Sequence, residues 1–152
     1  MPTSPHSRCL RSGRFSEPGR IYLVTTATEK RHPIFSSFHL GRLVVEQLRR
    51  TEHEGLAVSL AWVLMPDHLH WLLELKTGSL DRLVKQVKAS SAISIKRITQ
   101  RKGRIWQQGF HDRAMRYDED PIKAARYIVA NPLRAGLVER FGDYPLWDSV
   151  WL

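Results

Sequence analysis

The chain has 152 residues, a length that suits one compact domain with a buried core and leaves little room for two. Lys and Arg number 24 against 15 acidic residues, and the formal net charge of +9 favours a polyanionic partner such as nucleic acid. The single cysteine, Cys9, excludes a disulfide framework and a cysteine-based metal site. No apolar run approaches the roughly eighteen residues of a membrane span, and no signal peptide core is present, so we expect a soluble cytoplasmic protein without a membrane partner.

The chain begins with a segment unlike a folded core. Residues 1–19 are polar, basic and interrupted by Pro and Gly, which predicts a flexible basic arm ahead of a single domain over residues 20–152. Ile21–Ala27 is rich in β-branched and aromatic residues and predicts a first strand. Apolar residues then recur at helical spacing through residues 38–53, and Gly55 follows as a stop, so we expect a helix there.

The middle of the chain predicts a β-hairpin followed by a long helix. Residues 57–64 form an apolar strand, residues 66–67 carry turn chemistry, and residues 68–75 return as a second strand. Ser79 is then a suitable N-cap for a helix through about Thr99, in which an apolar stripe is flanked by basic faces.

The last third predicts one more strand and a C-terminal helix. The strand is expected within residues 104–116, with an interruption at Gly109. Acidic residues at 118–120 followed by Pro121 are typical of a helix start, and this helix should end near residues 131–132. The order of elements indicates an α+β fold: a ferredoxin-like antiparallel sheet with helices packed on one face and a C-terminal catalytic helix.

Two histidines in the second hairpin strand are candidate metal ligands. Side chains two apart in a strand point to the same face, so His68 and His70 project together, away from Leu69 and Trp71. Two converging imidazoles suit transition metals such as Mn²⁺ or Zn²⁺. The alternative is a pair of ordinary polar residues on the wet face of the sheet, because this spacing is common.

The C-terminal helix carries a second group of candidates. Tyr127 and Asn131 are four residues apart and so share a helix face. Each has a structural explanation, Tyr127 as a half-buried packing residue and Asn131 as a helix terminator before Pro132. With the two histidines they form a coherent site, in which the Asn131 amide oxygen completes a set of three metal ligands and leaves positions open for a phosphate.

This combination of residues suits transesterification of DNA. The metal would polarise the phosphate, the Tyr127 oxygen would attack phosphorus in line, and the 3′-hydroxyl would leave, giving a 5′-phosphotyrosine. Because the phosphoester is kept in the covalent bond, resealing needs no nucleotide. The sequence has no GxxxxGK[ST] phosphate loop, so we expect no nucleotide cofactor.

Basic and aromatic side chains supply candidate DNA contacts. Phosphate binding is the natural role of the basic residues near the proposed site, and the alternative for each is a solvated face. The predicted DNA-binding residues are Arg82, Lys85, Lys88, Lys96, Arg113 and Arg116. Trp106, Phe110 and Trp147 are candidates for stacking on unpaired bases, although most Trp in a small domain belong to its core.

Three segments of the sequence resemble a known family. They are VLMPDHLHWLLEL, IWQQGFHDRAMR and ARYIVANPLRAGLVERFGDYPLWDS. Together they are similar to the HUH single-tyrosine transposases, most closely to the branch called REP-associated tyrosine transposases. The resemblance covers roughly residues 20–147, nearly the whole chain outside the arm.

The resemblance implies metal-dependent cleavage of single-stranded DNA at short imperfect-palindrome hairpins repeated between bacterial genes. It places His68 and His70 in the His-hydrophobic-His metal motif, Tyr127 as the nucleophile, and Asn131 at the third ligand's place, where relatives outside this branch often have Gln. The resemblance also implies that the metal is Mg²⁺ or Mn²⁺, and two imidazoles and an amide suit Mn²⁺ better. The resemblance favours a monomer, and we expect this monomer to work in the bacterial cytoplasm in association with the nucleoid.

Two other functions remain open from the sequence. One is a catalytically idle nucleic-acid-binding protein that uses the same basic surface to bind hairpins. The other is a metal-dependent phosphodiesterase that uses a metal-bound water, whose activity would survive Tyr127→Phe. Tyr117 is the other tyrosine near the proposed site, so it belongs in the same experiment.

Overall fold

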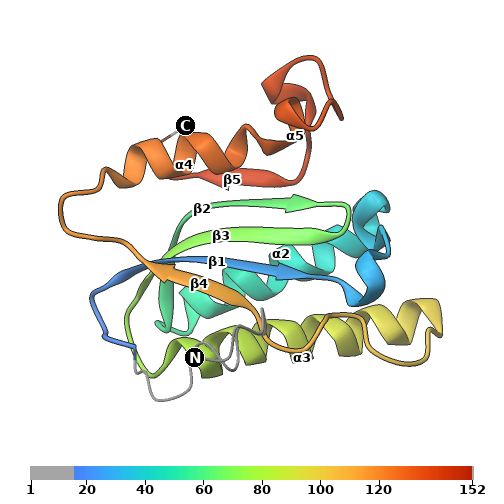
Figure 1. The fold of residues 1–152 in the computed structure, drawn as a ribbon. Coiled ribbons are helices and arrows are strands. Elements are labelled where there is room, and N and C mark those ends of the chain that lie inside the picture. The colour runs from blue at the N-terminus through green and yellow to red at the C-terminus, as the bar shows by residue number, and fades with distance from the viewer. Residues whose placement is uncertain (1–15, 152) are drawn as a thin grey trace.

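The structure is a computed structural model that describes residues 16–151 of the chain. Its centre is a five-stranded antiparallel sheet with the strand order β4-β1-β3-β2-β5 (Figure 1). The strands are β1 (Ile21–Ala27), β2 (Ala57–Met65), β3 (His68–Leu75), β4 (His111–Ala114) and β5 (Trp147–Ser149). The antiparallel α+β architecture predicted from the sequence is confirmed.

The β2–β3 hairpin forms the middle of the sheet. Met65 pairs with His68 beside the tight turn at residues 66–67, so the register of the whole hairpin is set there. A β-bulge between Ser59 and Ala61 bends β2 along its length. The histidines therefore lie at the turn end of β3, a strand whose main chain is fixed by neighbours on both sides.

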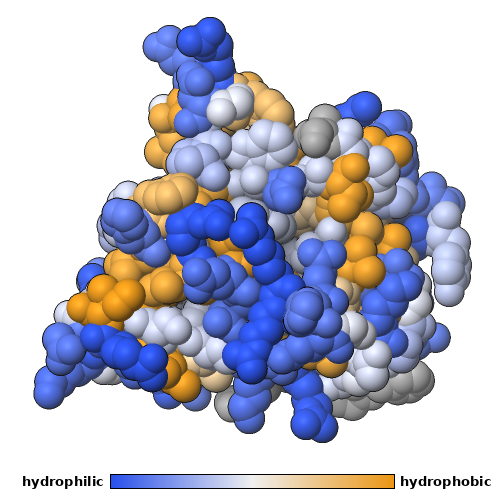
Figure 2. All heavy atoms as spheres, turned by 180° about the vertical axis from the view of Figure 1, so that it is seen from behind, coloured by the Kyte–Doolittle hydropathy of each residue, from blue (hydrophilic) through white to orange (hydrophobic). Residues whose placement is uncertain are grey.

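Two helices, α2 (Phe38–His53) and α3 (Leu80–Thr99), pack on one face of the sheet (Figure 1). Each begins at a serine: the Ser37 hydroxyl accepts from the Leu40 N–H at 3.4 Å, and the Ser79 hydroxyl accepts from the Arg82 N–H at 3.2 Å. Their apolar stripes cover the odd-numbered side chains of β3 and form the main core with them. Figure 2, a view from behind, shows an outer surface that is mostly hydrophilic with scattered hydrophobic patches.

The short helices α4 (Pro121–Val129) and α5 (Asn131–Arg134) lie on the opposite face. Asp120 caps α4 by accepting from the Ile122 N–H at 2.9 Å, and Pro121 occupies the first turn as predicted. Ala125, Ile128 and Val129 pack on β2 and β3 in a second, smaller core. The C-terminal helix thus covers the face of the sheet from which the histidines project.

The structure differs from the sequence-based expectation in two places. Residues 104–110 are not a strand; only His111–Ala114 is, and an isolated bridge joins Trp106 to Thr28. The reason is burial, because Ile105 and Trp106 turn inward under α3 instead of alternating. The short edge strand β5 was not predicted from the sequence.

Most of the predicted arm lies outside the described residues, which begin at Ser16. Its last residues are tied to the domain: the Gly19 N–H donates to the Leu75 carbonyl at 2.7 Å, and the Ser16 hydroxyl accepts from the Leu80 N–H at 2.8 Å. Within residues 16–151, no helix has the length and apolar character needed to cross a membrane.

Candidate active site

His68 and His70 face each other on the side of the sheet covered by α4. Their Nε2 atoms are 3.1 Å apart and their rings are nearly perpendicular, with centroids 4.7 Å apart. This is the same-face projection predicted from the spacing of the two residues. The pair is half-buried, so its environment is partly shielded from water.

The outer nitrogen of each ring is held by a neighbour. Nδ1 of His68 donates to the Asp67 carboxylate at 2.7 Å, and Nδ1 of His70 lies 3.1 Å from the Thr25 hydroxyl. The Thr25 hydroxyl can donate to or accept from Nδ1 of His70, so the ring tautomer decides whether the Nε2–H of one imidazole donates to the other. These contacts hold both rings with their Nε2 atoms directed at each other.

The separation of the two Nε2 atoms fits one octahedral metal ion. Ligands about 2.1 Å from a metal and at right angles to each other are about 3.0 Å apart, close to the observed 3.1 Å. Among residues 16–151, no group of three His, Cys, Asp or Glu side chains could hold a metal.

The electrostatics favour a neutral His70. Burial lowers the pKa of His70 to about 4, and the charges of His68, Arg134 and Arg31 act in the same direction. The ring is thus an uncharged ligand at neutral pH. Burial opposes ionisation of Asp67, but hydrogen bonds from Arg31 and His68 outweigh it and lower the pKa of that carboxyl.

Arg31 reaches Asp67 from an unusual backbone conformation. Its φ of 56° lies in the left-handed region, as does the φ of 54° at Lys30. Its Nε is 3.0 Å from the Asp67 carboxylate. Strained residues of this kind gather at functional sites, where the surrounding structure maintains them.

Tyr127 stands on α4 with two thirds of its surface exposed (66%). The Arg134 guanidinium carbon lies 3.8 Å from the centre of its ring, a close cation–π contact. The charge of Arg134 also acts on His70. Arg134 therefore contacts the Tyr127 ring and also contributes to the lowered pKa of His70.

Asn131 lies at a helix break caused by its neighbour. Pro132 has no N–H for the Ile128 carbonyl four residues earlier, and the Asn131 amide donates to that carbonyl instead, at 3.0 Å. The contact uses Nδ2 and leaves Oδ1 as the atom suited to a metal. Helix α4 ends at Val129 and α5 begins at Asn131. Tyr127 and Asn131 therefore belong to two successive helices, and not to one face of a single helix as the sequence predicted.

The predicted DNA-binding residues differ in how they are engaged. Arg82 and Lys85 are exposed on α3, and Lys96 is half-buried there. Arg113 donates to both oxygens of Glu119 at 2.7 and 2.9 Å, and Arg116 lies 3.3 Å from Asp118. The Arg116–Asp118 pair is exposed on both sides, whereas the Arg113–Glu119 pair is bidentate and its carboxylate is mostly shielded from solvent.

Lys88 binds main-chain atoms of the protein. Its ammonium donates to the main-chain carbonyls of Gln107 and Gly109 at 2.7 and 2.5 Å, which fastens the 104–110 segment to α3. Burial lowers the pKa of Lys88 to about 8. The amine is therefore still largely charged at neutral pH.

The three candidate stacking aromatics are packed within the fold. Trp106 is buried and its indole N–H donates to the Ser91 hydroxyl at 3.0 Å, and Phe110 belongs to the same core. Trp147 packs on Phe141 with ring centroids 4.5 Å apart. These three aromatic side chains therefore pack within the fold, which was the alternative to stacking on unpaired bases.

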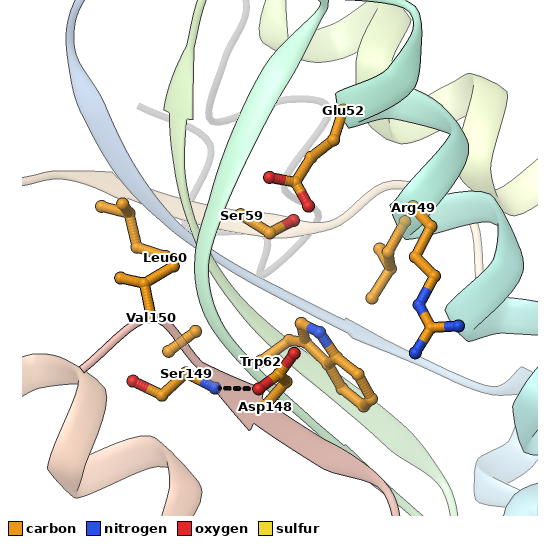
Figure 3. Close-up of a pocket in the computed structure, with 10 residues that line it drawn as sticks. Arg49, Glu52, Ser59, Leu60, Trp62, Asp148, Ser149 and Val150 are labelled. Atoms are coloured by element: carbon orange, nitrogen blue, oxygen red, sulfur yellow. Dashed lines mark hydrogen bonds between the residues drawn. The ribbon is translucent and has the colours of Figure 1, made fainter. Parts of the chain in front are cut away.

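A separate hollow of about 130 Å³ opens beside β5 (Figure 3). It is lined by α2 residues such as Arg49 and Glu52 and by Asp148 of β5. Its charges are of mixed sign, and none of the predicted site residues lines it. This hollow is therefore distinct from the histidine pair.

The sequence analysis treats Asp67 only as a turn residue and gives no role to Thr25 or Arg31. Thr25 pairs with His70 across β1 and β3, a contact that appears only once the strand order is known. The spacing of residues in the sequence gives no indication that Arg31 contacts Asp67. On the other side of β1, His111 of β4 lies opposite Thr25.

Comparison with known proteins identifies the family. A family model described as "Transposase IS200 like" matches residues 20–131. A REP-associated tyrosine transposase of Escherichia coli K12 is 32% identical over 90 residues, which cover 56% of this chain and 50% of that protein. This chain thus matches about half of the length of that relative.

Two further matches cover more of the chain. A Haemophilus influenzae Rd protein, provisionally named a REP-associated tyrosine transposase, is 25% identical over 141 residues, or 84% of this chain and 78% of that protein. The solved structure of a REP-associated tyrosine transposase bound to a REP hairpin has a TM-score of 0.72 at 21% identity and covers 88% of this chain and 79% of its own. That likeness concerns the fold.

The resemblance predicted from the sequence is confirmed by these matches. The region that the family model matches contains both histidines, Tyr127 and Asn131. The chain belongs to the IS200-like transposase family.

Proposed function

We propose that this protein is a metal-dependent single-tyrosine transposase that cuts and rejoins single-stranded DNA at repeated hairpins through a 5′-phosphotyrosine. The observation that carries the proposal is the pair of Nε2 atoms 3.1 Å apart, on the face of the sheet that the Tyr127 helix covers. Family membership supports the same activity. The REP hairpin bound by the structural neighbour supports hairpin DNA as the substrate.

In the proposed reaction the Tyr127 oxygen forms a bond to phosphorus and the bond from phosphorus to the 3′-oxygen breaks. The phenol proton passes to solvent, and the leaving 3′-oxygen gains a proton to become a hydroxyl. Rejoining reverses these steps with another 3′-hydroxyl, so no nucleotide is consumed. In each direction one phosphoester bond is broken and one is formed, between phosphorus and either the Tyr127 oxygen or a 3′-oxygen.

The residues of the site have distinct tasks in this scheme. His68, His70 and the Oδ1 of Asn131 would hold a divalent ion, Mg²⁺ or Mn²⁺, which supplies charge stabilisation to the phosphate. Asp67 and Thr25 orient the two imidazoles. Arg134 fixes the Tyr127 ring and offers positive charge to the incoming phosphate. The resemblance to the REP-associated branch favours a monomer that uses its own Tyr127.

The test is a covalent adduct. The protein is incubated with Mn²⁺ and end-labelled hairpins from repeats beside its gene, and the products are separated on denaturing protein gels. A labelled protein band that requires metal and disappears in Tyr127→Phe supports the proposal.

Tyr117→Phe is the matched control, because Tyr117 is also exposed and also contacts an arginine, with Arg20 Cζ 5.1 Å from its ring. This variant should retain the band. Binding without any adduct would favour an idle hairpin-binding protein. Cleavage that survives Tyr127→Phe without an adduct would favour a hydrolase that uses water.

A further inference from the structure

Residues 28–35 wrap around the turn of the β2–β3 hairpin. The Thr28 N–H donates to the Asp67 carbonyl at 2.9 Å, and the Phe35 N–H donates to the Pro66 carbonyl at 2.9 Å. The hydroxyl of Thr28, a fully buried residue, lies 3.2 Å from the Asp67 carbonyl oxygen. These contacts hold the segment against the turn that leads into β3.

Two consecutive residues of this segment have left-handed backbone conformations. The φ angles are 54° at Lys30 and 56° at Arg31. A residue with a Cβ adopts this region at a cost in free energy, whereas glycine adopts it without that cost. The conformation brings the Arg31 guanidinium to Asp67, where Nε donates to the carboxylate at 3.0 Å. Lys30 shares the backbone conformation, but among residues 16–151 the ionic partners of Asp67 are Arg31 and His68.

Asp67 and Arg31 make opposite demands on the same nitrogen of His68. A carboxylate only accepts hydrogen bonds, so the Asp67 oxygen 2.7 Å from Nδ1 requires a proton on that nitrogen. A guanidinium only donates, so a bond from Nη2 of Arg31, which lies 3.4 Å from Nδ1, would require an unprotonated Nδ1. The shorter distance favours Asp67. In the neutral ring, a proton on Nδ1 leaves Nε2 of His68 with the lone pair that can bind a metal.

Arg31 assists Asp67 in this competition by holding the other carboxylate oxygen. Its Nε binds Oδ2 of Asp67, and Oδ1 of the same carboxylate accepts from His68. The carboxylate therefore cannot rotate without breaking one of the two bonds. The carboxylate side chain is 26% exposed, so the pair is partly shielded from the water that would otherwise weaken it.

We propose that Arg31 is a positioning residue of the metal site: it fixes the Asp67 carboxylate against Nδ1 of His68, which keeps Nε2 of that histidine available to a divalent ion. The inference rests on the proposed function, because it takes the histidine pair as the metal site of that reaction. In this role Arg31 contacts neither the metal nor the DNA. The strained conformation of residue 31 is the cost of presenting its side chain to Asp67.

The first test determines the tautomer of His68 without metal or DNA. Long-range ¹H–¹⁵N spectra of the imidazole nitrogens in EDTA, assigned with His68→Gln, should show the Nδ1–H form in the wild type. Arg31→Gly suits the observed φ and should raise the population of the Nε2–H form. Lys30→Gly makes the same change one residue earlier and should leave the tautomer as it is. An Nε2–H form in the wild type, an unchanged tautomer in Arg31→Gly, or the same change in Lys30→Gly would overturn the inference.

The second test measures Mn²⁺ affinity by titration calorimetry. Arg31→Gly should weaken binding roughly 10-fold, the lower end of the range for residues that support metal ligands. Lys30→Gly should bind Mn²⁺ as the wild type does. Arg31→Lys keeps the charge but loses the planar guanidinium, so it should recover only part of the affinity. Thermal unfolding checks that both glycine variants are folded, which we expect because glycine tolerates a positive φ.

A double variant decides whether Arg31 acts through Asp67. Adding Arg31→Gly to Asp67→Asn should change Mn²⁺ affinity by less than about twofold, because the group that Arg31 holds has already been altered. Losses that multiply independently would overturn the inference. Unchanged Mn²⁺ affinity in Arg31→Gly together with weaker hairpin binding in EDTA would also overturn it, because Arg31 would then be a phosphate ligand.

These measurements separate the inference from the proposed function, because neither of them needs a covalent adduct. An adduct in the wild type with equal Mn²⁺ affinity in Arg31→Gly would remove the role of Arg31 alone. Mn²⁺ binding that depends on Arg31 in a protein that forms no adduct would count against the transferase reaction. Arg31 would then remain a positioning residue in a metal-binding protein.

Discussion

The guanidinium carbon of Arg134 lies 3.8 Å from the centre of the Tyr127 ring, although the two residues belong to different helices. Such a contact holds the ring in one orientation and places positive charge over the ring of the proposed nucleophile. Arg134→Gln should therefore slow adduct formation by roughly 100-fold at saturating DNA, because the lost interaction belongs to the transition state.

The measurement is the single-turnover rate of adduct formation together with the DNA affinity of each variant. Arg126→Gln is the control, since Arg126 is exposed on α4 one residue before Tyr127. Arg134→Lys keeps the charge but loses the planar stack, so it should recover only part of the rate. Equal rates in Arg134→Gln and the wild type would remove Arg134 from the site.

Asp67 should affect metal affinity without binding the metal. Its carboxylate accepts from Nδ1 of His68 at 2.7 Å and so fixes the ring for coordination. Asp67→Asn should weaken Mn²⁺ binding roughly 10- to 100-fold, while His70→Gln should abolish it. Titration calorimetry with Mn²⁺ measures both effects, and Glu74→Gln, on the same strand, is the control. Tight Mn²⁺ binding in His70→Gln would contradict the assignment of the site.

Asn131 is expected to have two separable roles. Asn131→Ala removes the side-chain donor to the Ile128 carbonyl and should reduce the free energy of unfolding by about 1 kcal/mol. Adding Pro132→Ala returns a main-chain N–H to that position, so the double variant should recover stability. Metal affinity should stay low in both, because neither has the amide oxygen.

Urea unfolding and Mn²⁺ titration of the two single variants and the double variant complete a thermodynamic cycle. Recovery of metal affinity in the double variant would show that Asn131 acts on the backbone and does not bind the ion.

Lys88 should make stability depend on pH in the alkaline range. Its pKa falls from 10.5 to about 8 through burial, so between these values the unfolded chain binds more protons than the folded one. The contribution of Lys88 to the free energy of unfolding therefore rises with pH from about 8 to about 10.5. Lys88→Met should lack this rise, whereas Lys85→Met should keep it, in urea unfolding at pH 7.5, 9 and 10. Identical pH dependence in the wild type and Lys88→Met would contradict the prediction.

Much of the fold could be predicted because its signals are local. The strand Ile21–Ala27 and the helix Phe38–His53 have the predicted bounds, since side-chain periodicity and a capping serine act over a few residues. The prediction of a strand at residues 104–110 was wrong because Trp106 is buried against Ser91 of α3, which lies fifteen residues earlier in the chain. The sequence carries no local sign of that contact.

The candidate site also has contacts that the sequence predicts and contacts that it does not. The pairing of His68 with His70 follows from strand periodicity alone, and the structure places their Nε2 atoms together. The contact between Thr25 and His70 needs the strand order, and the contact between Arg134 and Tyr127 needs the helix break. Supporting residues of a site are therefore harder to predict than its ligands.

The two edge strands are only four and three residues long, β4 (His111–Ala114) and β5 (Trp147–Ser149). An edge of that length exposes few unpaired main-chain groups, so it offers a poor template for another chain to extend the sheet. The short edges therefore limit edge-to-edge pairing between copies of this chain, which reduces its tendency to aggregate at high concentration.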